Sequence, residues 1–174
     1  MSIKIRKADS GDAYQTTFVL YKTWLDTYPN KEHGVTIDDI EYKFKYFFTE
    51  DNLKKRATII KDYSENEIML VAEEEGEIIG LVKITKTEDR NEIEAIYVLP
   101  GHQRKGVGTM LWNESQKHFN QELETVVNVA TYNDKAINFY RNIGFQETGV
   151  VWSDEKFRMK SGSIIPQTKL IIKR

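Results

Sequence analysis

The sequence predicts a mixed α/β domain in which helices flank a sheet that contains one parallel crossover. Three observations support this prediction. The apolar period changes from helical to alternating near residue 68, three strand-like runs then follow through tight turns, and a helix separates the last of them from the next strand. A length of 174 residues is enough for one domain with a sizeable core. We therefore expect a single domain over residues 1–174.

The first third of the chain predicts one strand and three helices. Residues 2–7 alternate apolar and charged side chains as a strand does, so we do not expect a signal peptide there. Asp9 or Ser10 caps the next helix, which ends before the first proline of the chain. Thr36 caps a second helix, and residues 51–62 predict a third.

The remainder predicts an antiparallel meander followed by a crossover. A strand that follows a helix is expected to lie parallel to the strand before that helix, and the last two strands are expected to form a hairpin. The predicted elements are strands 68–73, 78–87 and 92–98, helix 107–119, strand 124–130, helix 133–142, and strands 145–151 and 164–172.

Composition excludes several classes of function. The chain has no cysteine, which excludes disulfides and thiolate chemistry. A net charge of −2 argues against nucleic acid as a partner, and no apolar run is long enough to span a membrane. We expect a cytoplasmic location by default. His33, His102 and His118 lack a second ligand at metal-binding spacing, so we expect no metal.

The most informative motif follows strand 92–98. It reads Gln103-Arg104-Lys105-Gly106-Val107-Gly108-Thr109 and opens directly onto a predicted helix. The start of a helix directs backbone N–H groups and the positive end of its dipole at one point, which suits phosphate. Glycine lets the backbone approach a ligand closely. The motif therefore predicts a site for a pyrophosphate-bearing cofactor.

Two motifs in the same order carry a family resemblance. Tyr97-Val98-Leu99-Pro100 with the glycine loop, followed by the run Asn133 to Phe145, resembles the GNAT N-acetyltransferase superfamily. The resemblance implies a GNAT fold, a mixed and mostly antiparallel sheet of about seven strands that splays at its two central parallel strands. It also implies that residues 92–146 form an acetyl-CoA-binding core and that residues 10–65 form a helical acceptor side.

The resemblance implies how acetyl-CoA is bound. The loop, through Gln103, Arg104, Lys105, Gly106, Val107, Gly108 and Thr109, holds the pyrophosphate. The main chain of Ile96, Tyr97 and Val98 pairs with the pantetheine arm, which carries amides. Asn133 and Phe139 contact the same arm, and Tyr140 lies near the sulfur.

It also implies the catalytic groups. Tyr140 matches the family's general acid, and a phenol with a pKa near ~10 is a suitable proton donor to a leaving thiolate. Glu92 and Glu94 share one strand face and are the candidate bases, with Glu94 preferred and water open as a third candidate. The backbone N–H of Val98 is expected to donate to the thioester oxygen.

The acceptor is expected to be a small-molecule primary amine, polyamine-like or of another kind. Trp24, Tyr28, Tyr46 and Glu94 are the candidate acceptor residues, since Trp24 to Tyr28 resembles the Trp-x-x-x-Tyr of some small-amine and polyamine acetylating members. Two alternatives remain: a protein N-terminus or lysine as acceptor, or a domain that senses acetyl-CoA without turnover. Family members often dimerise, so a homodimer is compatible with the resemblance.

Overall fold

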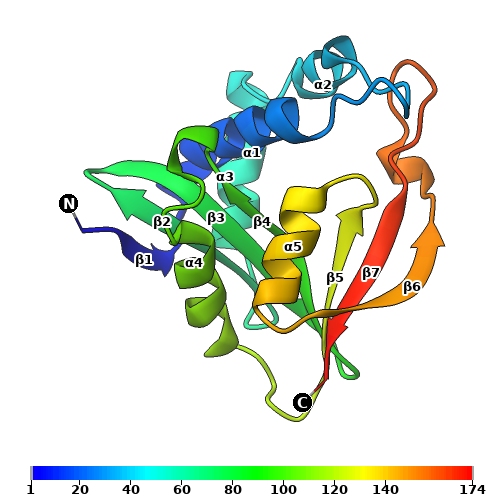
Figure 1. The fold of residues 1–174 in the computed structure, drawn as a ribbon. Coiled ribbons are helices and arrows are strands. Elements are labelled where there is room, and N and C mark those ends of the chain that lie inside the picture. The colour runs from blue at the N-terminus through cyan, green and yellow to red at the C-terminus, as the bar shows by residue number, and fades with distance from the viewer. Residues whose placement is uncertain (1, 174) are drawn as a thin grey trace.

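The structure, a computed structural model that describes residues 2–173, contains one seven-stranded sheet with helices on both faces (Figure 1). The strand order is β1-β2-β3-β4-β5-β7-β6. Only β4 and β5 run parallel; every other neighbouring pair is antiparallel. The predicted mixed sheet with one parallel crossover is therefore confirmed.

The elements lie close to their predicted positions. The strands are β1 (Lys4–Lys7), β2 (Glu67–Glu74), β3 (Glu77–Lys86), β4 (Asn91–Val98), β5 (Thr125–Ala130), β6 (Gln146–Trp152) and β7 (Gln167–Ile172). The α-helices are α1 (Ala13–Thr27), α2 (Ile37–Phe44), α3 (Glu50–Lys61), α4 (Val107–Gln116) and α5 (Asp134–Asn142), and the short 3-10 helices are η1 (Ser10–Asp12), η2 (Pro100–His102) and η3 (Glu155–Phe157).

Two predicted helix caps are present, and one predicted helix end is wrong. The Thr36 hydroxyl accepts the Asp39 N–H, and the Asp39 carboxylate accepts the Thr36 N–H, which forms a capping box at the start of α2. Asp9 caps η1 in the same reciprocal way. Helix α4 ends three residues before the predicted position, because a turn there directs Phe119 into the core.

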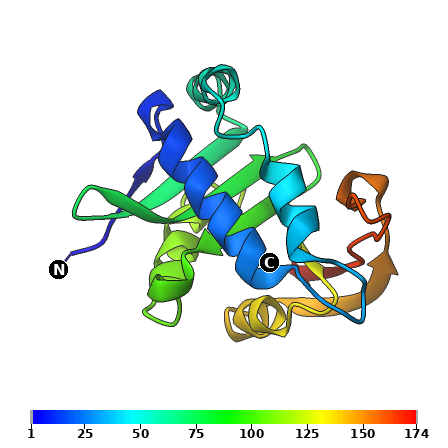
Figure 2. The ribbon, with the colours of Figure 1, turned by 90° about the horizontal axis from the view of Figure 1, so that it is seen from above.

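Helices cover the sheet in two layers. Helices α4 and α5 lie on one face, and α1, α2 and α3 lie on the other, as the view in Figure 2 shows. Leu111, Trp112 and Tyr140 belong to the larger core beneath α4 and α5. Trp24 and Phe44 belong to a separate core beneath α1 and α2. Within residues 2–173, every helix is too short or too polar to span a bilayer.

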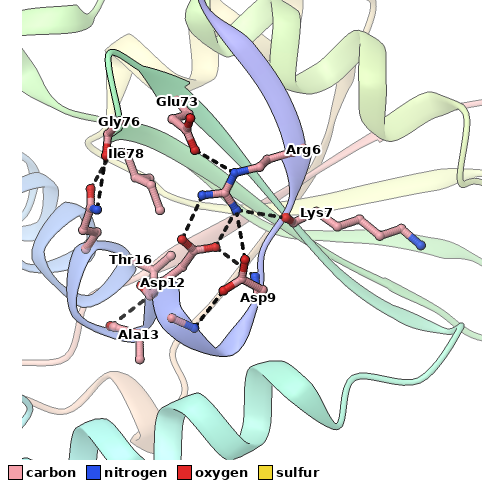
Figure 3. A network of polar contacts seen from close by, with 11 residues as sticks. Arg6, Lys7, Asp9, Asp12, Ala13, Thr16, Glu73, Gly76 and Ile78 are labelled. Atoms are coloured by element: carbon pink, nitrogen blue, oxygen red, sulfur yellow. Dashed lines mark hydrogen bonds and ion pairs between the residues drawn. The ribbon is translucent and has the colours of Figure 1, made fainter.

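A charged cluster fixes the start of α1 to the edge of the sheet (Figure 3). Arg6 of β1 donates to both carboxylate oxygens of Asp12, at 2.6 and 2.9 Å, and its Nε donates to Glu73 of β2 at 2.7 Å. Asp12 is buried and also accepts the Asp9 N–H at 2.8 Å. One guanidinium thus joins β1, β2 and the turn that leads into α1.

Replacing Arg6 by alanine is expected to lower the free energy of unfolding by roughly 2–3 kcal/mol at pH 7, because Asp12 would remain buried without its cation. Burial by itself raises the pKa of Asp12, but the hydrogen bonds from Arg6 and Asp9 outweigh it and the pKa is lowered. A lowered folded-state pKa contributes stability above the unfolded pKa of ~4, and this contribution is lost as pH falls through the folded value.

Urea denaturation at pH 7 and near pH 3 measures both effects. Arg141→Ala is the matched control, because its ion pair with Glu147 lies on the surface and should contribute less than about 1 kcal/mol. The cost of Arg6→Ala should shrink at the lower pH. An equal cost at both pH values would contradict the assigned role of the Arg6–Asp12 pair.

Candidate active site

The two central strands separate soon after they begin. The parallel pairing of β4 with β5 covers Asn91↔Thr125 to Ile93↔Val127 and then stops. Beyond it, residues 95–98 of β4 still pair with β3. Leu99 donates to β3, and because N–H groups alternate between the two sides of a strand, those of Ile96 and Val98 face the split. The sheet therefore offers an unpaired strand edge at its centre.

A bulge lies at the point where the split opens. Lys83 of β3 pairs with Ala95 and the next residue, Ile84, pairs with Ile93, so Glu94 is the extra residue of β4. Bulges often re-aim side chains beside active sites. Glu92 and Glu94 line the same cavity, as their shared strand face predicted.

The loop between β4 and α4 has a left-handed backbone at two positions. Arg104 has φ = 60° and Gly106, the N-cap of α4, has φ = 83°. Met110 N donates the first helical hydrogen bond to Gly106 O at 2.9 Å. The N–H groups of the first turn precede that bond and point out of the helix end, where they and the dipole favour an anion.

Side-chain contacts hold this loop beside α5. Gln103 Nε2 donates to Val98 O at 3.1 Å, which joins the loop to the end of β4. A Cβ on Gly108 would lie 3.2 Å from the Phe139 ring, so glycine permits this close approach. Arg104 and Lys105 are exposed, and no carboxylate among residues 2–173 lies within 4.0 Å of either cation.

Helix α5 directs a buried phenol at the split. Its cap Asn133 accepts the Ala136 N–H at 3.1 Å, and Tyr140, two turns later, is only 4% exposed. Burial raises the pKa of Tyr140 well above its usual value, the nearby Tyr97 raises it further, and a hydrogen bond from the Ile96 backbone opposes them. Tyr140 is therefore a protonated phenol at neutral pH, held against the unpaired edge of β4.

Two further phenols, those of Tyr28 and Tyr97, lie on the other face of the sheet, beneath α1. Trp24 Nε1 donates to the Tyr97 hydroxyl at 3.1 Å, and the Tyr28 hydroxyl lies 3.5 Å from it. Burial raises the pKa of both Tyr28 and Tyr97. Tyr97 packs on the α1 face and Tyr140 on the α5 face, yet Tyr97 is close enough to help raise the pKa of Tyr140. The split thus connects the two faces of the sheet.

A cavity of about 590 Å³ opens on the α1 side of this connection. Helices α1 and α3, strands β2 to β5 and the segment 152–167 contribute its walls. Trp24 and Tyr97 form part of the aromatic lining, and the charged lining residues are Arg56, Lys83, Glu92, Glu94 and Lys156. Among residues 2–173, no three His, Asp or Glu side chains group as metal ligands would.

Comparison with known proteins identifies the family. The model of the acetyltransferase (GNAT) family matches residues 21–145, which is more than half of the chain. The chain belongs to this family. Its membership confirms the resemblance carried by the two motifs, and the enzyme class predicted from them, an acyltransferase, is that of the family.

Two relatives of this GNAT chain carry names that specify an acetyltransferase. It is 33% identical over 99 residues to the peptidyl-lysine N-acetyltransferase YiaC of Escherichia coli (strain K12), a match that covers 56% of this chain and 63% of that protein. It is 29% identical over 124 residues to an N-alpha-acetyltransferase of Sulfurisphaera tokodaii, covering 62% of this chain and 68% of that protein. The match thus spans less than two thirds of the Escherichia coli protein and slightly more than two thirds of the Sulfurisphaera protein.

The fold is shared with a solved structure. The PaiA N-acetyltransferase of Thermoplasma acidophilum, solved in complex with coenzyme A, superimposes with a TM-score of 0.75 at 22% identity over the whole of both chains. At this identity the likeness establishes the fold alone. The predicted GNAT fold, with its sheet splayed at the central parallel pair, is confirmed.

The structure groups most of the residues predicted for this GNAT site. The cofactor candidates are Ile96 to Val98 on β4, the loop 103–109 that follows β4, and Asn133, Phe139 and Tyr140 at the cap and within α5. Of the acceptor candidates, Trp24 and Glu94 line the cavity, whereas Tyr28 does not line it and has its hydroxyl 3.5 Å from that of Tyr97. Tyr46 does not join them, because it follows the end of α2 and is 59% exposed.

Both candidate bases form ion pairs. Glu94 accepts from Lys83 Nζ at 2.9 Å and from the Thr85 hydroxyl at 2.5 Å. Burial lowers the pKa of Lys83, but its hydrogen bond and charge interaction with Glu94 outweigh burial and the pKa is raised. Glu92 lies 3.5 Å from Arg90. Lys83 therefore stays positively charged beside Glu94.

Sequence reasoning missed several residues of the cavity wall. Of these residues, Lys83 could have been found from the sequence, because it interrupts an otherwise apolar run in a buried strand. Arg56 follows two exposed lysines on α3 and had no feature that set it apart. Trp152, at the end of β6, and Lys156, in the β6–β7 connection, also line the cavity although they are distant from most of its other walls in sequence.

Proposed function

We propose that this chain transfers the acetyl group of acetyl-CoA to the primary amine of a small molecule that enters the cavity. The observation that carries the proposal is the split between β4 and β5. At the split the N–H groups of Ile96 and Val98 have no strand partner among residues 2–173, the Ile96 backbone lies beside the Tyr140 phenol, and residues of β4 and β5 line the cavity.

The residues around the split fit acetyl-CoA. The glycine loop presents the N–H donors and the cations Arg104 and Lys105 to a pyrophosphate. The free edge of β4 offers main-chain partners to the pantetheine amides, as an added strand would. The related fold of the Thermoplasma protein, which was solved with coenzyme A, supports this assignment.

Each group then has a defined role. Acetyl-CoA supplies a thioester that an amine attacks directly, forming the C–N bond as the C–S bond breaks. The Val98 N–H donates to the thioester oxygen as negative charge develops on it. Tyr140 gives its proton to the departing sulfur. Glu94, acting through water, takes the proton that the amine loses.

A second acceptor class has a specific observation in its favour. The relatives from Escherichia coli and Sulfurisphaera tokodaii carry names that denote acetylation of peptidyl lysine and of a protein N-terminus. A peptide amine is therefore the competing acceptor. The third alternative, a domain that senses acetyl-CoA without turnover, gives no reason for a buried phenol at the split.

A thiol-release assay tests the proposal. The protein is incubated with acetyl-CoA and, in turn, amino acids, ω-amino acids, spermidine, an aminoglycoside and peptides, and released CoA is followed with DTNB. We expect at least one small amine to release CoA, and acetyl-CoA alone to raise the melting temperature. Release with peptides only would favour the second class. Stabilisation by acetyl-CoA without release from any amine would favour the sensor.

Replacing Glu94 by glutamine should lower kcat/KM about 10- to 100-fold near pH 7, and only a few-fold near pH 9.5, with the best amine from that assay. An alkylamine has a pKa near ~10, so the base matters most where the amine is still protonated. The pH profile of kcat/KM measures this difference.

Glu67→Gln is the control, because Glu67 also lies near Lys83, at 3.8 Å, but does not line the cavity. It should leave the profile unchanged. A loss of equal size at every pH in Glu94→Gln would remove Glu94 as the base and leave it as the partner of Lys83.

A further inference from the structure

One cation in the wall of the cavity has no counter-ion. Arg56 of α3 lines the cavity, and its Nε donates to the Thr16 hydroxyl at 3.3 Å. No carboxylate of residues 2–173 lies within 4.0 Å of its guanidinium. The two terminal nitrogens, which carry four of its five N–H donors, thus have no protein acceptor in the described part of the chain.

The other charged lining residues are all paired. Lys83 lies 2.9 Å from Glu94, Lys156 lies 3.4 Å from Asp154, and Glu92 lies 3.5 Å from Arg90. In each pair the positive and the negative charge offset each other within the cavity wall or at its rim. The lining charge that is left without an opposite partner among residues 2–173 is the positive charge of Arg56.

This guanidinium is also partly removed from water. Burial lowers the pKa of Arg56 from its usual value, while the neighbouring Tyr63 opposes that change. Arginine remains charged in proteins, so removing it from water without a partner lowers the free energy of unfolding. A cation kept in this state next to a cavity is suited to an anion, and the planar guanidinium fork matches a carboxylate.

We propose that the acceptor of this enzyme is an amine that also carries a carboxylate, and that Arg56 binds this carboxylate while the amine reaches the split. The inference rests on the proposed function and names its substrate class. It disfavours the polyamine-like acceptor expected from the aromatic run on α1, because a polycation would be repelled by Arg56. The carboxylate can belong to a free amino acid or to an acidic peptide.

Matched acceptor pairs test this proposal. In the first arm, 4-aminobutyrate is compared with 4-aminobutyramide; in the second, a dipeptide amide with glutamate after the reactive N-terminal residue is compared with its glutamine form. Wild-type protein should prefer the carboxylate form in at least one arm by about 10- to 100-fold in kcat/KM. The arm that shows the preference identifies the source of the carboxylate.

Arg56→Gln should abolish the preference, because the charged hydrogen bonds that distinguish the carboxylate from the neutral amide are lost. Lys55→Gln, an exposed neighbour on the same helix, is the control and should keep the preference. Equal rates with both members of both pairs in wild-type protein would overturn the proposal, although turnover itself would uphold the acetyltransferase.

A binding measurement decides the matter if neither pair turns over. With saturating CoA present, the melting temperature is measured with each acceptor. Carboxylate forms should stabilise wild-type protein and Lys55→Gln, but not Arg56→Gln. Stabilisation that is the same in Arg56→Gln, or absent from wild-type protein, would overturn the role of Arg56.

Discussion

Replacing Tyr140 by phenylalanine is expected to lower kcat about 100- to 1,000-fold and to change the affinity for acetyl-CoA less than three-fold. The phenol is buried, has a raised pKa and lies against the backbone of Ile96 at the edge of the split. Its removal deletes the proton for the leaving sulfur but keeps the ring that packs in the core. Steady-state kinetics and titration with acetyl-CoA measure the two quantities.

Tyr132→Phe is the control for the Tyr140 substitution. That hydroxyl donates to the Tyr28 carbonyl at 3.0 Å, outside the split, so its loss should leave kcat within a few-fold. Because burial keeps Tyr140 protonated, wild-type kcat should not decline on the alkaline side below about pH 10. An unchanged kcat in Tyr140→Phe would remove this residue as the acid.

Replacing Gly106 by valine is expected to raise the Kd for acetyl-CoA by about 10- to 100-fold. Gly106 has φ = 83°, which a β-branched residue adopts only with strain of about 1–2 kcal/mol. Relief of that strain would turn the loop and move the unpaired N–H groups at the start of α4. Calorimetric titration with acetyl-CoA measures the change in affinity.

Gly76→Val separates loss of the site from loss of stability. Gly76 has φ = 84° in the turn between β2 and β3, and a Cβ there would meet nothing within 4 Å, as at Gly106. Both variants should therefore lose similar stability, but only Gly106→Val should lose affinity. Equal losses of affinity in both variants would mean that the effect of Gly106→Val comes from lower overall stability and not from the geometry of the loop.

The fold was predictable because its signals are local. The period-two runs from residue 68 onward identified β2 to β4, and the position of α4 between β4 and β5 predicted their parallel pairing. The capping box of Thr36 likewise depends on residues three apart in sequence. Two motifs within residues 92–146 were enough to predict the family.

The acceptor side was less predictable because it depends on long-range contacts. Arg56, Lys83 and Trp152 meet at one cavity although the chain between them spans about a hundred residues, and no local pattern encodes that meeting. The bulge at Glu94 was equally invisible, since strict alternation predicts a regular strand. Tyr46 was expected on the acceptor side, but it lies beyond α2, which ends at Phe44.

The split between β4 and β5 also bears on the order in which the two substrates can bind. A donor held between the glycine loop and α5 would approach from one face of the sheet, and an acceptor in the cavity would approach from the other. Neither substrate would then block the entrance of its partner. Because the amine is proposed to attack the thioester directly, turnover would require both substrates to be bound at once, and double-reciprocal plots should intersect whichever substrate is varied.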